Sequence, residues 1–413
     1  MKPISPFFAA QVGLDWADRK HDLCLNEHNS KELEYSVIKH TPESIDEWAL
    51  SLQKRFNGKP IAICLELKAG PVVYALLKYQ FITLYPVSPK ALAKYRQSFC
   101  QSGAKDDPTD AFLQLDYLQK HSEALRPLVP DDPQTRILQQ LVEDRRHFVD
   151  EKVRLTNASR AVLKSYYPQV LQWFADIDTP LFCDFILQWP NLEEVQKASA
   201  DTISQFLKAR RCVRANVIDR RTQAIRTAMP LTEDEGVIIP MQRRATSLIR
   251  QLQQVLTTIT EYDLDIAERF AKHAEYELFN SLPSAGAAFG PRLLAAFGTN
   301  RERYRSADEV ARYGGVAPVL ERSGTKTWVH WRYCCTKFLR QTFVEWANQS
   351  RKTCFWAEEF YVKKRAQGKP HQATLRALAF KWIRIIFRCW QSRTLYNEST
   401  YLFALKRRKA LAS

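Results

Sequence analysis

Glycine is nearly absent from the middle of this chain of 413 residues, and that absence constrains the fold more than any other feature of the sequence. Between residues 70 and 286 only two glycines occur, Gly103 and Gly236. Because glycine supplies the turns that interrupt regular structure, a long stretch that is poor in it is predicted to be helical. The chain is therefore divided into an N-terminal domain over 1–125, a helical middle over 126–275, a C-terminal domain over 276–395 and a basic tail over 396–413.

Runs with the spacing of strands alternate with helical runs in the N-terminal domain. Strands are predicted over residues 7–14, 21–26, 35–38, 61–65 and 81–85. Helices are predicted between them, over residues 44–52 and 72–79. Strands that alternate with helices are typical of an α/β sheet with helices on its faces. We therefore expect an α/β N-terminal domain followed by a mostly helical remainder.

Apolar residues in the helical middle recur with heptad spacing. Late in this region they alternate in steps of four and three, at Leu248, Leu252, Val255, Ile259, Tyr262 and Ile266. Earlier ones are seven apart, at Leu141, Phe148, Leu155 and Val162. This pattern favours a coiled coil or a long helical hairpin, and an ordinary helix packed on its own domain is equally compatible with it. A coiled coil between chains would give a homo-oligomer, a dimer or a tetramer.

The charge balance points to a polyanionic partner. The chain has 61 Lys and Arg against 45 Asp and Glu, a net charge of +16. Such a surplus is typical of proteins that bind nucleic acid or an anionic membrane. No apolar run is long enough to cross a bilayer, and the N-terminus lacks the features of a signal peptide. Nine cysteines without a CxxC pair indicate neither a disulfide framework nor a zinc site, so we expect a cytoplasmic protein that does not bind membranes.

Four carboxylates are candidate metal ligands. Asp15 and Glu66 close two of the predicted strands, at the rim where α/β sheets bind ligands. Asp107 and Asp110 lie in GAKDDPTDA at the start of a predicted helix, three residues apart, so both point toward one helix end. Taken alone, Asp107 is a good N-cap and Asp110 a favourable first-turn acid. Taken together, four carboxylates can hold two Mg²⁺ or Mn²⁺ ions for phosphoryl transfer.

The C-terminal domain contains two segments suited to nucleic acid. LPSAGAAFGPRLLAAF places a glycine turn before an apolar helix and is similar to a helix-hairpin-helix, although an ordinary helical hairpin has the same pattern. Farther on, Ser323 and Gly324 lie in a polar turn, where a serine can act as a nucleophile or simply form the turn. Basic and aromatic residues are interleaved after it, namely Lys326, Trp328, His330, Trp331, Arg332, Tyr333, Lys337, Phe338 and Arg340.

In this order, the motifs resemble the DEDD transposases of the insertion-sequence group that uses an element-encoded bridge RNA. The first family aspartate matches Asp15 in VGLDWADRKHDLCL, and the family glutamate matches Glu66 in ICLELKAG. The K-x-D-x-x-D-A frame matches Asp107 and Asp110, and P-x-x-x-x-S-G matches Ser323. The resemblance covers roughly residues 7–125 and 276–350. It implies a RuvC-like N-terminal fold, related to RNase H, and a C-terminal transposase domain that carries a serine.

The resemblance also implies a mechanism and partners. Metal ions held by Asp15, Glu66, Asp107 and Asp110 would activate phosphoryl transfer, and Ser323 would form a covalent serine–DNA intermediate. The helical middle would bind the guide RNA and join protomers. Because Ser323 follows Asp110 by 213 positions (323 minus 110), the composite site can form between subunits.

The chain departs from the family pattern in two places. Leu67, Lys68 and Ala69 separate Glu66 from Gly70, where relatives often have a shorter loop, and Asp106 lies next to Asp107. The main alternative is a structure-selective nuclease of the Holliday-junction resolvase type, which uses metal-activated water. A resolvase needs no C-terminal serine region. A nucleic-acid-binding scaffold without metal dependence is the non-enzymatic alternative, and no glycine-rich phosphate loop supports a kinase.

Overall fold

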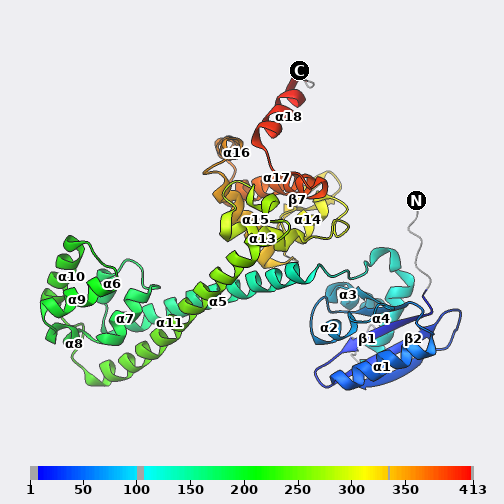
Figure 1. Ribbon diagram of the computed structural model, residues 1–413, viewed down its shortest axis with the longest axis horizontal. Coiled ribbons are helices and arrows are strands. Elements are labelled where there is room, and N and C mark those ends of the chain that lie inside the picture. Colours follow the sequence, from blue (N-terminus) through cyan, green and yellow to red (C-terminus); the bar gives the residue numbers. More distant parts are fainter. Residues whose placement is uncertain (1–7, 100–106, 334, 411–413) are drawn as a thin grey trace. The chain divides into compact units, whose positions relative to one another are not determined.

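The computed structural model describes residues 8–99, 107–333 and 335–410, and the side chains of residues 107, 404–406 and 408–410 lie outside the described part. The chain divides into two compact units, Met1–Pro130 and Asp131–Ser413, and each is described by itself (Figure 1). None of the described helices is both long and apolar enough to span a membrane.

The first unit is built on a mixed sheet. Among its described residues, five strands lie in the order β3-β2-β1-β4-β5. They are β1 (Ala10–Trp16), β2 (Lys20–Glu27), β3 (Glu34–Lys39), β4 (Ile61–Leu65) and β5 (Ile82–Pro86). The pairs β1–β2 and β2–β3 are antiparallel, whereas β4 runs parallel to both β1 and β5. The expected α/β class of this region is confirmed.

Helices cover both faces of this sheet. They are α1 (Pro42–Arg55), α2 (Pro71–Leu76), α3 (Pro89–Phe99), α4 (Asp107–Lys120) and the 3₁₀ turn η1 (Ser122–Ala124). Val12, Leu14 and Ile63 pack in one core with residues of α1 and α2. On the other face α4 approaches so closely that a Cβ added to Gly13 would lie 1.9 Å from the carbonyl oxygen of Ala111. Glycine in β1 therefore permits the docking of α4.

The predicted strands and the observed ones differ most at β1. The prediction ended this strand before Asp15, but antiparallel pairing with β2 continues through Asp15 to Trp16. Phe7, where the predicted strand began, lies outside the described residues. The buried run 61–65 was predicted to the residue.

The second unit begins with a long helical hairpin. α5 (Pro133–Tyr166) and α11 (Glu235–Ala271) lie side by side in Figure 1, in cyan and green. Rings of Phe148 and Tyr262 meet at 5.3 Å between centroids, and Arg145 pairs with Asp263 across the two helices. The end of the hairpin carries α6 (Val170–Trp173), α7 (Pro180–Gln188), α8 (Leu192–Lys197), α9 (Ala200–Ala209) and α10 (Ala215–Thr227).

Residues of the heptad pattern pack in the hydrophobic cores of this one chain. Leu252 is buried in the core that α11 shares with α5 and α7, and Ile266 is buried in the core of the C-terminal helices. Of the alternatives that the spacing left open, the structure has a helical hairpin within one chain. A coiled coil between chains and a helical hairpin within one chain bury the same stripe of apolar residues. The heptad pattern alone therefore does not distinguish these two structures.

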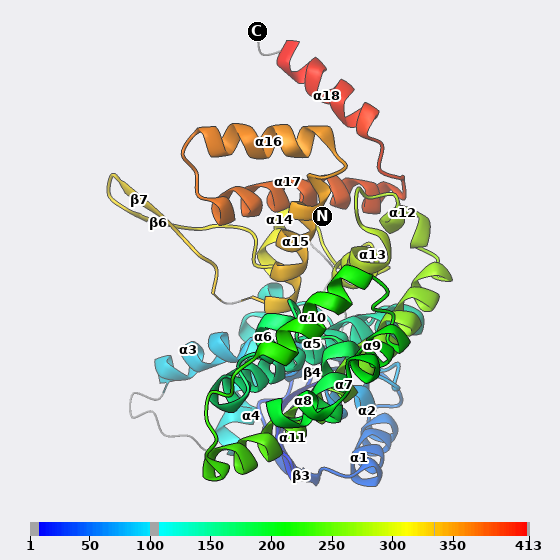
Figure 2. The same ribbon diagram turned by 90° about the vertical axis from the view of Figure 1, so that its left-hand side faces the viewer.

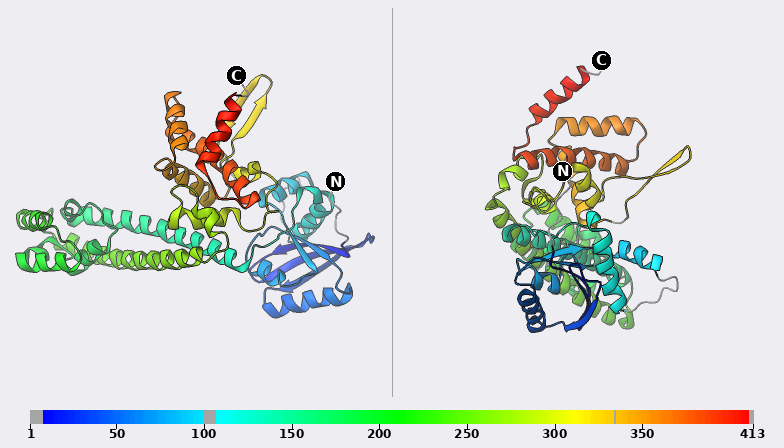
Figure 3. Two further views of the ribbon diagram at one scale, coloured as in Figure 1. Left: turned by 45° about the horizontal axis from the view of Figure 1, so that its top comes forward. Right: turned by 90° about the vertical axis from the view of Figure 1, so that its right-hand side faces the viewer.

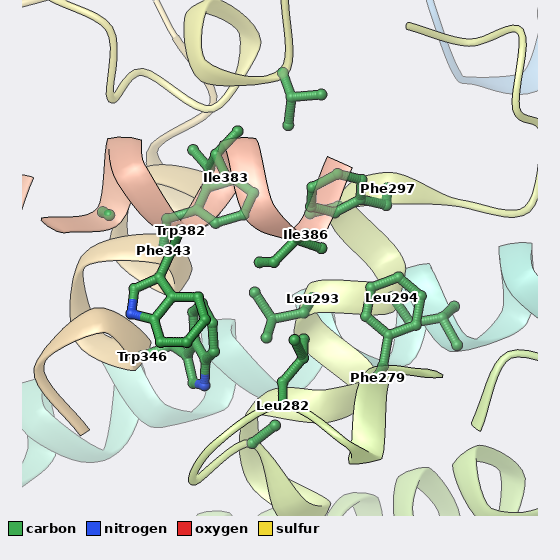
Figure 4. Packing of buried hydrophobic residues seen from close by; sticks show 14 of the residues in the cluster. Phe279, Leu282, Leu293, Leu294, Phe297, Phe343, Trp346, Trp382, Ile383 and Ile386 are labelled. Atoms are coloured by element: carbon green, nitrogen blue, oxygen red, sulfur yellow. The ribbon is translucent and has the colours of Figure 1, made fainter. Parts of the chain in front are cut away.

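The remaining helices pack around a core rich in aromatic residues. They are α12 (Tyr276–Asn280), α13 (Gly286–Phe297), α14 (Ala307–Tyr313), α15 (Lys337–Ser350), α16 (Phe355–Ala366), α17 (His371–Ser392) and α18 (Glu398–Ala410). Figure 4 shows Trp346 and Trp382 in this core, and their ring centroids are 4.8 Å apart. α13, the apolar helix of the predicted helix-hairpin-helix, supplies Leu293, Leu294 and Phe297 to the same core.

A two-stranded hairpin extends from these helices. β6 (Val319–Ser323) and β7 (Lys326–His330) pair antiparallel, and Figure 2 shows them reaching away from α14 and α15. All their residues are exposed except Val319, which is half-buried. Because an isolated two-stranded hairpin is marginally stable in water, this one is suited to binding something else.

Candidate active site

Asp15 and Glu66 occupy equivalent positions on two neighbouring parallel strands. In the register of β1 and β4, Leu14 is the partner of Leu65, and Asp15 and Glu66 each follow directly. Adjacent strands are about 4.8 Å apart, so the two acids emerge next to each other at one edge of the sheet. The register sets the two positions side by side, and a meeting of the two carboxylates at the sheet rim stays a prediction.

The alternation of side chains places both acids on the face that α4 covers. Gly13 meets α4 directly, and Asp15 lies two residues farther along the same strand. Cys64 is the register partner of Gly13, and Glu66 lies two residues beyond Cys64. Burial, with a contribution from the charge of Glu66, raises the pKa of the Cys64 thiol to about 12.

A third acid of the sheet lies on this face. Asp22 in β2 is the cross-strand partner of Asp15, and directly opposed residues project to the same side. Its side chain is buried, and Nζ of Lys20 lies 3.1 Å from Oδ2. The alternating run HDLCL contains Asp22, but only the register of β1 and β2 reveals its proximity to Asp15.

Helix α4 contributes Gln114 to the face of the sheet that carries Asp15 and Asp22. Nε2 of Gln114 donates a hydrogen bond of 3.3 Å to Oδ1 of Asp15. The side chain is completely buried, and its Oε1 has no hydrogen-bond partner among the described residues. An unsatisfied buried oxygen beside a carboxylate is an arrangement that a bound cation or its water can complete.

Asp110 precedes Gln114 by one helical turn. Its carboxylate is paired with the guanidinium group of Arg96. Its exposed fraction is 2%, and Nη2 of Arg96, from α3, lies 2.6 Å from Oδ1. The contact is an ion pair without hydrogen-bond geometry, and Oδ1 of Asp110 accepts no other hydrogen bond in the described part. Arg96 therefore supplies the positive charge that a buried carboxylate requires.

One of the four candidate carboxylates, that of Asp107, belongs to a side chain that the structure does not describe. Asp107 is the first residue of α4, but its side chain lies outside the described part, as does all of Asp106. Among the side chains that are described, no three from His, Cys, Asp and Glu are grouped closely enough to hold a metal ion. The carboxylates suit a hard divalent cation by donor type, and the unsatisfied Oε1 of Gln114 agrees with that.

Ser323 lies in the second unit, at the tip of the β6–β7 hairpin. It is the last residue of β6 and pairs with Lys326, across a turn of Gly324 and Thr325. Gly324 has a φ of 58°, which suits glycine at the first central position of a two-residue hairpin turn. Ser323 is exposed, and the register places Glu321, Trp328 and Lys326 on its face of the hairpin. The predicted polar turn is thus a β-hairpin that presents Ser323 outward.

Three side chains around the carboxylates were not predicted, namely Asp22, Arg96 and Gln114. Their positions depend on strand register and on how α3 and α4 dock, neither of which follows from local spacing. One signal was available in Gly13, since a glycine inside a strand marks a close backbone approach. It indicates that another part of the backbone lies close to β1, but not which element this is or which of its residues face Asp15.

Two family models match the two ends of the chain. The DEDD model of IS110 elements, described as transposase, matches residues 12–168. A second model, described as the transposase IS116/IS110/IS902 family, matches residues 276–362. The first contains all four candidate carboxylates, and the second contains Ser323.

Similar proteins from insertion elements cover most of the chain. One, from Streptomyces coelicolor and named for the transposase of the IS117 mini-circle, is 25% identical over 398 residues, 94% of this chain and 95% of that protein. The 42 kDa protein of insertion element IS900 from Mycobacterium paratuberculosis is 22% identical over 94% of this chain and 97% of its own length. The 44.8 kDa protein of insertion element IS116 from Streptomyces clavuligerus is 23% identical over 82% and 84%.

Proposed function

Because the chain belongs to the IS116/IS110/IS902 family of transposases, we propose that it cuts and rejoins DNA with a carboxylate site in its first unit and Ser323 in its second. The observation that carries the proposal is the register that sets Asp15 beside Glu66, on the face where α4 brings Asp110. A RuvC-like fold, related to RNase H, is part of the proposal, and the mixed sheet with acids at its edge supports it.

Asp15, Glu66, Asp107 and Asp110 are the residues that would hold Mg²⁺ or Mn²⁺. When bound, such ions polarise a phosphodiester and stabilise the charge that develops on its oxygens. Gln114 holds Asp15 in place from α4, which restricts the carboxylate to one orientation. Arg96 balances the charge of Asp110 in the chain alone. These contacts keep the acids positioned before substrate arrives, which is the protein's part in phosphoryl transfer.

Ser323 is the proposed nucleophile. Its Oγ would attack phosphorus as a carboxylate of the set accepts the hydroxyl proton, and a serine–phosphate bond would form. One P–O bond of the DNA would break, and the leaving oxygen would take up a proton to become a free hydroxyl. The released DNA hydroxyl can later attack the same phosphorus and free the serine, so rejoining needs no ATP. Exposure at a hairpin tip suits this role, because a DNA backbone can reach the hydroxyl.

A guide RNA is the further partner that we propose, together with assembly into a homo-oligomer. The RNA rests on the family resemblance, and the net charge of +16 agrees with a nucleic-acid partner of either kind. If the purified chain carries no RNA, and RNA transcribed from its element neither binds nor supports strand exchange, the guide is excluded. Light scattering of the purified chain measures the oligomeric state.

The decisive experiment looks for a covalent adduct. End-labelled DNA carrying the element ends is incubated with the chain and Mg²⁺, and denaturing gels are searched for a shifted, protease-sensitive band. The band is expected for the wild type, and should be absent with Ser323→Ala or EDTA. Thr325→Ala is the matched control, since Thr325 is the hydroxyl of the same turn, and should keep the band. Cleavage without any such band would favour metal-activated water and a resolvase mechanism.

A further inference from the structure

Two arginines from different helices gather on one tryptophan at the base of the β6–β7 hairpin. Cζ of Arg340, in α15, lies 4.6 Å from the ring centroid of Trp331, and Cζ of Arg376, in α17, lies 4.0 Å from it. Trp331 directly follows β7. The three side chains thus join two helices of the second unit to the root of the strand that pairs with Ser323.

No carboxylate neutralises this pair in the described part of the chain. Neither Arg340 nor Arg376 forms an ion pair there, and the charge of Arg340, after burial, contributes to lowering the pKa of Arg376. Five other half-buried arginines of the same unit do have an acid, in the pairs Arg145–Asp263, Arg292–Glu345, Arg301–Glu275, Arg303–Asp131 and Arg351–Glu358. Two like charges held together without an acid form a site for an external anion.

Arg340 is also hydrogen-bonded to the chain at the base of the hairpin. Nη1 of Arg340 donates a hydrogen bond of 3.1 Å to the carbonyl of Arg332, just after Trp331. Nε of Arg332 donates 3.3 Å to the carbonyl of Ala317, just before β6. Both ends of the hairpin are therefore anchored at this point. Within the described part of the chain, most guanidinium donors of Arg340 and Arg376 have no hydrogen-bond acceptor, so they can bind a ligand.

We propose that Arg340 and Arg376, gathered on Trp331, form a phosphate clamp for the DNA strand that Ser323 attacks. Guanidinium forks match the paired oxygens of a phosphodiester, and contact with the Trp331 ring keeps both guanidinium groups close to one another. The exposed hairpin, which extends from the helices in Figure 3, carries Lys326 and His330 on the face of Ser323. Glu321 lies on the same face, with its Oε2 3.0 Å from Nε2 of His330. A DNA strand lying along β7 would follow this surface.

The distance from the clamp to Ser323 sets which phosphate is held. Trp331 is five residues beyond Lys326, the strand partner of Ser323. At roughly 3.3 Å per strand residue, the clamp lies about 16 Å from the serine. A duplex rises about 3.4 Å per nucleotide, so the clamped phosphate lies roughly five nucleotides from the one that is attacked.

Binding of DNA tests the clamp without any cleavage. Fluorescence anisotropy of a labelled duplex of about 30 base pairs, over about 50 to 300 mM salt, gives the affinity and its salt slope. Arg340→Gln with Arg376→Gln should reduce affinity about 10-fold or more and the slope by roughly one to two. Arg384→Gln is the matched control, an exposed arginine two turns along α17, and should change affinity less than about twofold.

Two further controls test whether the variants fold and whether the bound partner is DNA. Arg340→Lys with Arg376→Lys keeps both charges and should recover part of the affinity, while thermal melting shows whether each variant folds. An affinity and slope like those of the control would overturn the clamp. Loss of binding to RNA with unchanged binding to DNA would also overturn it, since the proposal is for a DNA strand.

The position of the clamped phosphate depends on the proposed function, because only the attacked strand has a defined cleavage point. Neutral methylphosphonates are placed one at a time along that strand. One position about five nucleotides from the cut should weaken binding to the wild type, with little effect on the double glutamine variant. The same loss at that position in both proteins would contradict the clamp. Absence of a Ser323 adduct, with the anisotropy result intact, would refute the serine mechanism alone.

Discussion

Gln114 donates a hydrogen bond from Nε2 to Oδ1 of Asp15, joining α4 to β1 over 3.3 Å. The two residues are 99 positions apart in the chain, and the contact exists because Gly13 lets α4 approach the strand. It links the helix of the paired aspartates to the first strand acid. The orientation of Asp15 therefore depends on a residue of the helix that carries Asp110.

Gln114→Ala should weaken binding of divalent metal. Residues that orient a metal ligand typically contribute about 10-fold or more to affinity, so a loss of that order is expected for Mn²⁺. Calorimetric titration of the full chain measures it without reference to DNA cleavage. Gln119→Ala is the control, because Gln119 lies on the same helix and donates to Asn26 at the surface. Equal affinities for the two variants would show that Gln114 does not orient Asp15 toward a metal.

Arg96→Gln should destabilise the metal-free chain and increase the stabilisation that metal provides. Removing the guanidinium leaves Asp110 buried and unpaired, which costs about 3 kcal/mol in such pairs. A divalent ion at the carboxylates would replace that charge. Thermal melting with EDTA and with Mg²⁺ is the measurement, and the shift with Mg²⁺ should be larger in the variant than in the wild type.

The control for Arg96 is an exposed pair of the same unit. Arg55 bridges Glu27 and Glu34 at the surface, so Arg55→Gln should lower stability by less than about 1 kcal/mol and leave the Mg²⁺ shift unchanged. A Mg²⁺ shift in Arg96→Gln no larger than that of Arg55→Gln would separate Asp110 from the metal.

Stability of the first unit should fall as the pH drops from about 6.5 toward 4. Burial, then the nearby His40, lowers the pKa of His21 from 6.5 to about 4, against a smaller opposing effect of Asp22. The unfolded chain takes up a proton near pH 6.5, which the folded chain does not accept until about pH 4. The stabilisation is therefore complete above pH 6.5 and is lost across that window.

Hydrogen exchange of β2 amides, corrected for intrinsic rates, reports this dependence in the full chain. His21→Gln removes the titrating group and should flatten the decline, whereas His28→Gln, at the surface after β2, should not. An identical decline in His21→Gln would assign it to other groups.

Local pattern predicted those parts of the fold in which burial and spacing agree. The run 61–65 is buried at every position, and its boundaries followed from its apolar residues alone. Asp15 and Glu66 were expected at strand ends by the same reasoning. β1 continues one residue past Asp15, and the parallel register gives the two acids equivalent positions. The carboxylate of Asp110 was singled out as a candidate ligand, but its pairing with Arg96 was not predicted.

The local sequence pattern did not predict which residues of different helices and strands contact one another. Gln114 looks like any polar residue in a helix, and only the rotation of α4 against Gly13 directs it to Asp15. Arg340 and Arg376 were separated by 36 positions (376 minus 340), and packing of α15 on α17 brings both to Trp331. Such positions are set by tertiary packing, which no spacing within one helix encodes.

Mixed oligomers should show whether Ser323 acts on the carboxylates of its own chain or of another. The β6–β7 hairpin is exposed on nearly every residue, and no packing within the described part of its unit buries Ser323, which suits delivery to a second copy. We therefore expect action in trans. Chains carrying Ser323→Ala and chains carrying Glu66→Gln are given different tags, co-expressed and purified through both tags. Each variant should be inactive alone, because one lacks the serine and the other lacks a carboxylate.

In a dimer with trans sites, one site combines the intact carboxylates of the first chain with the intact serine of the second. Adduct formation should then return to roughly half the wild-type level, because one of two symmetric sites is whole. The reciprocal pairing, wild type with a chain carrying both changes, should be inactive, since each of its sites then contains one damaged half. If the sites form within one chain, the two outcomes reverse, because the first pairing has a defect in both sites while the second keeps the wild-type chain whole.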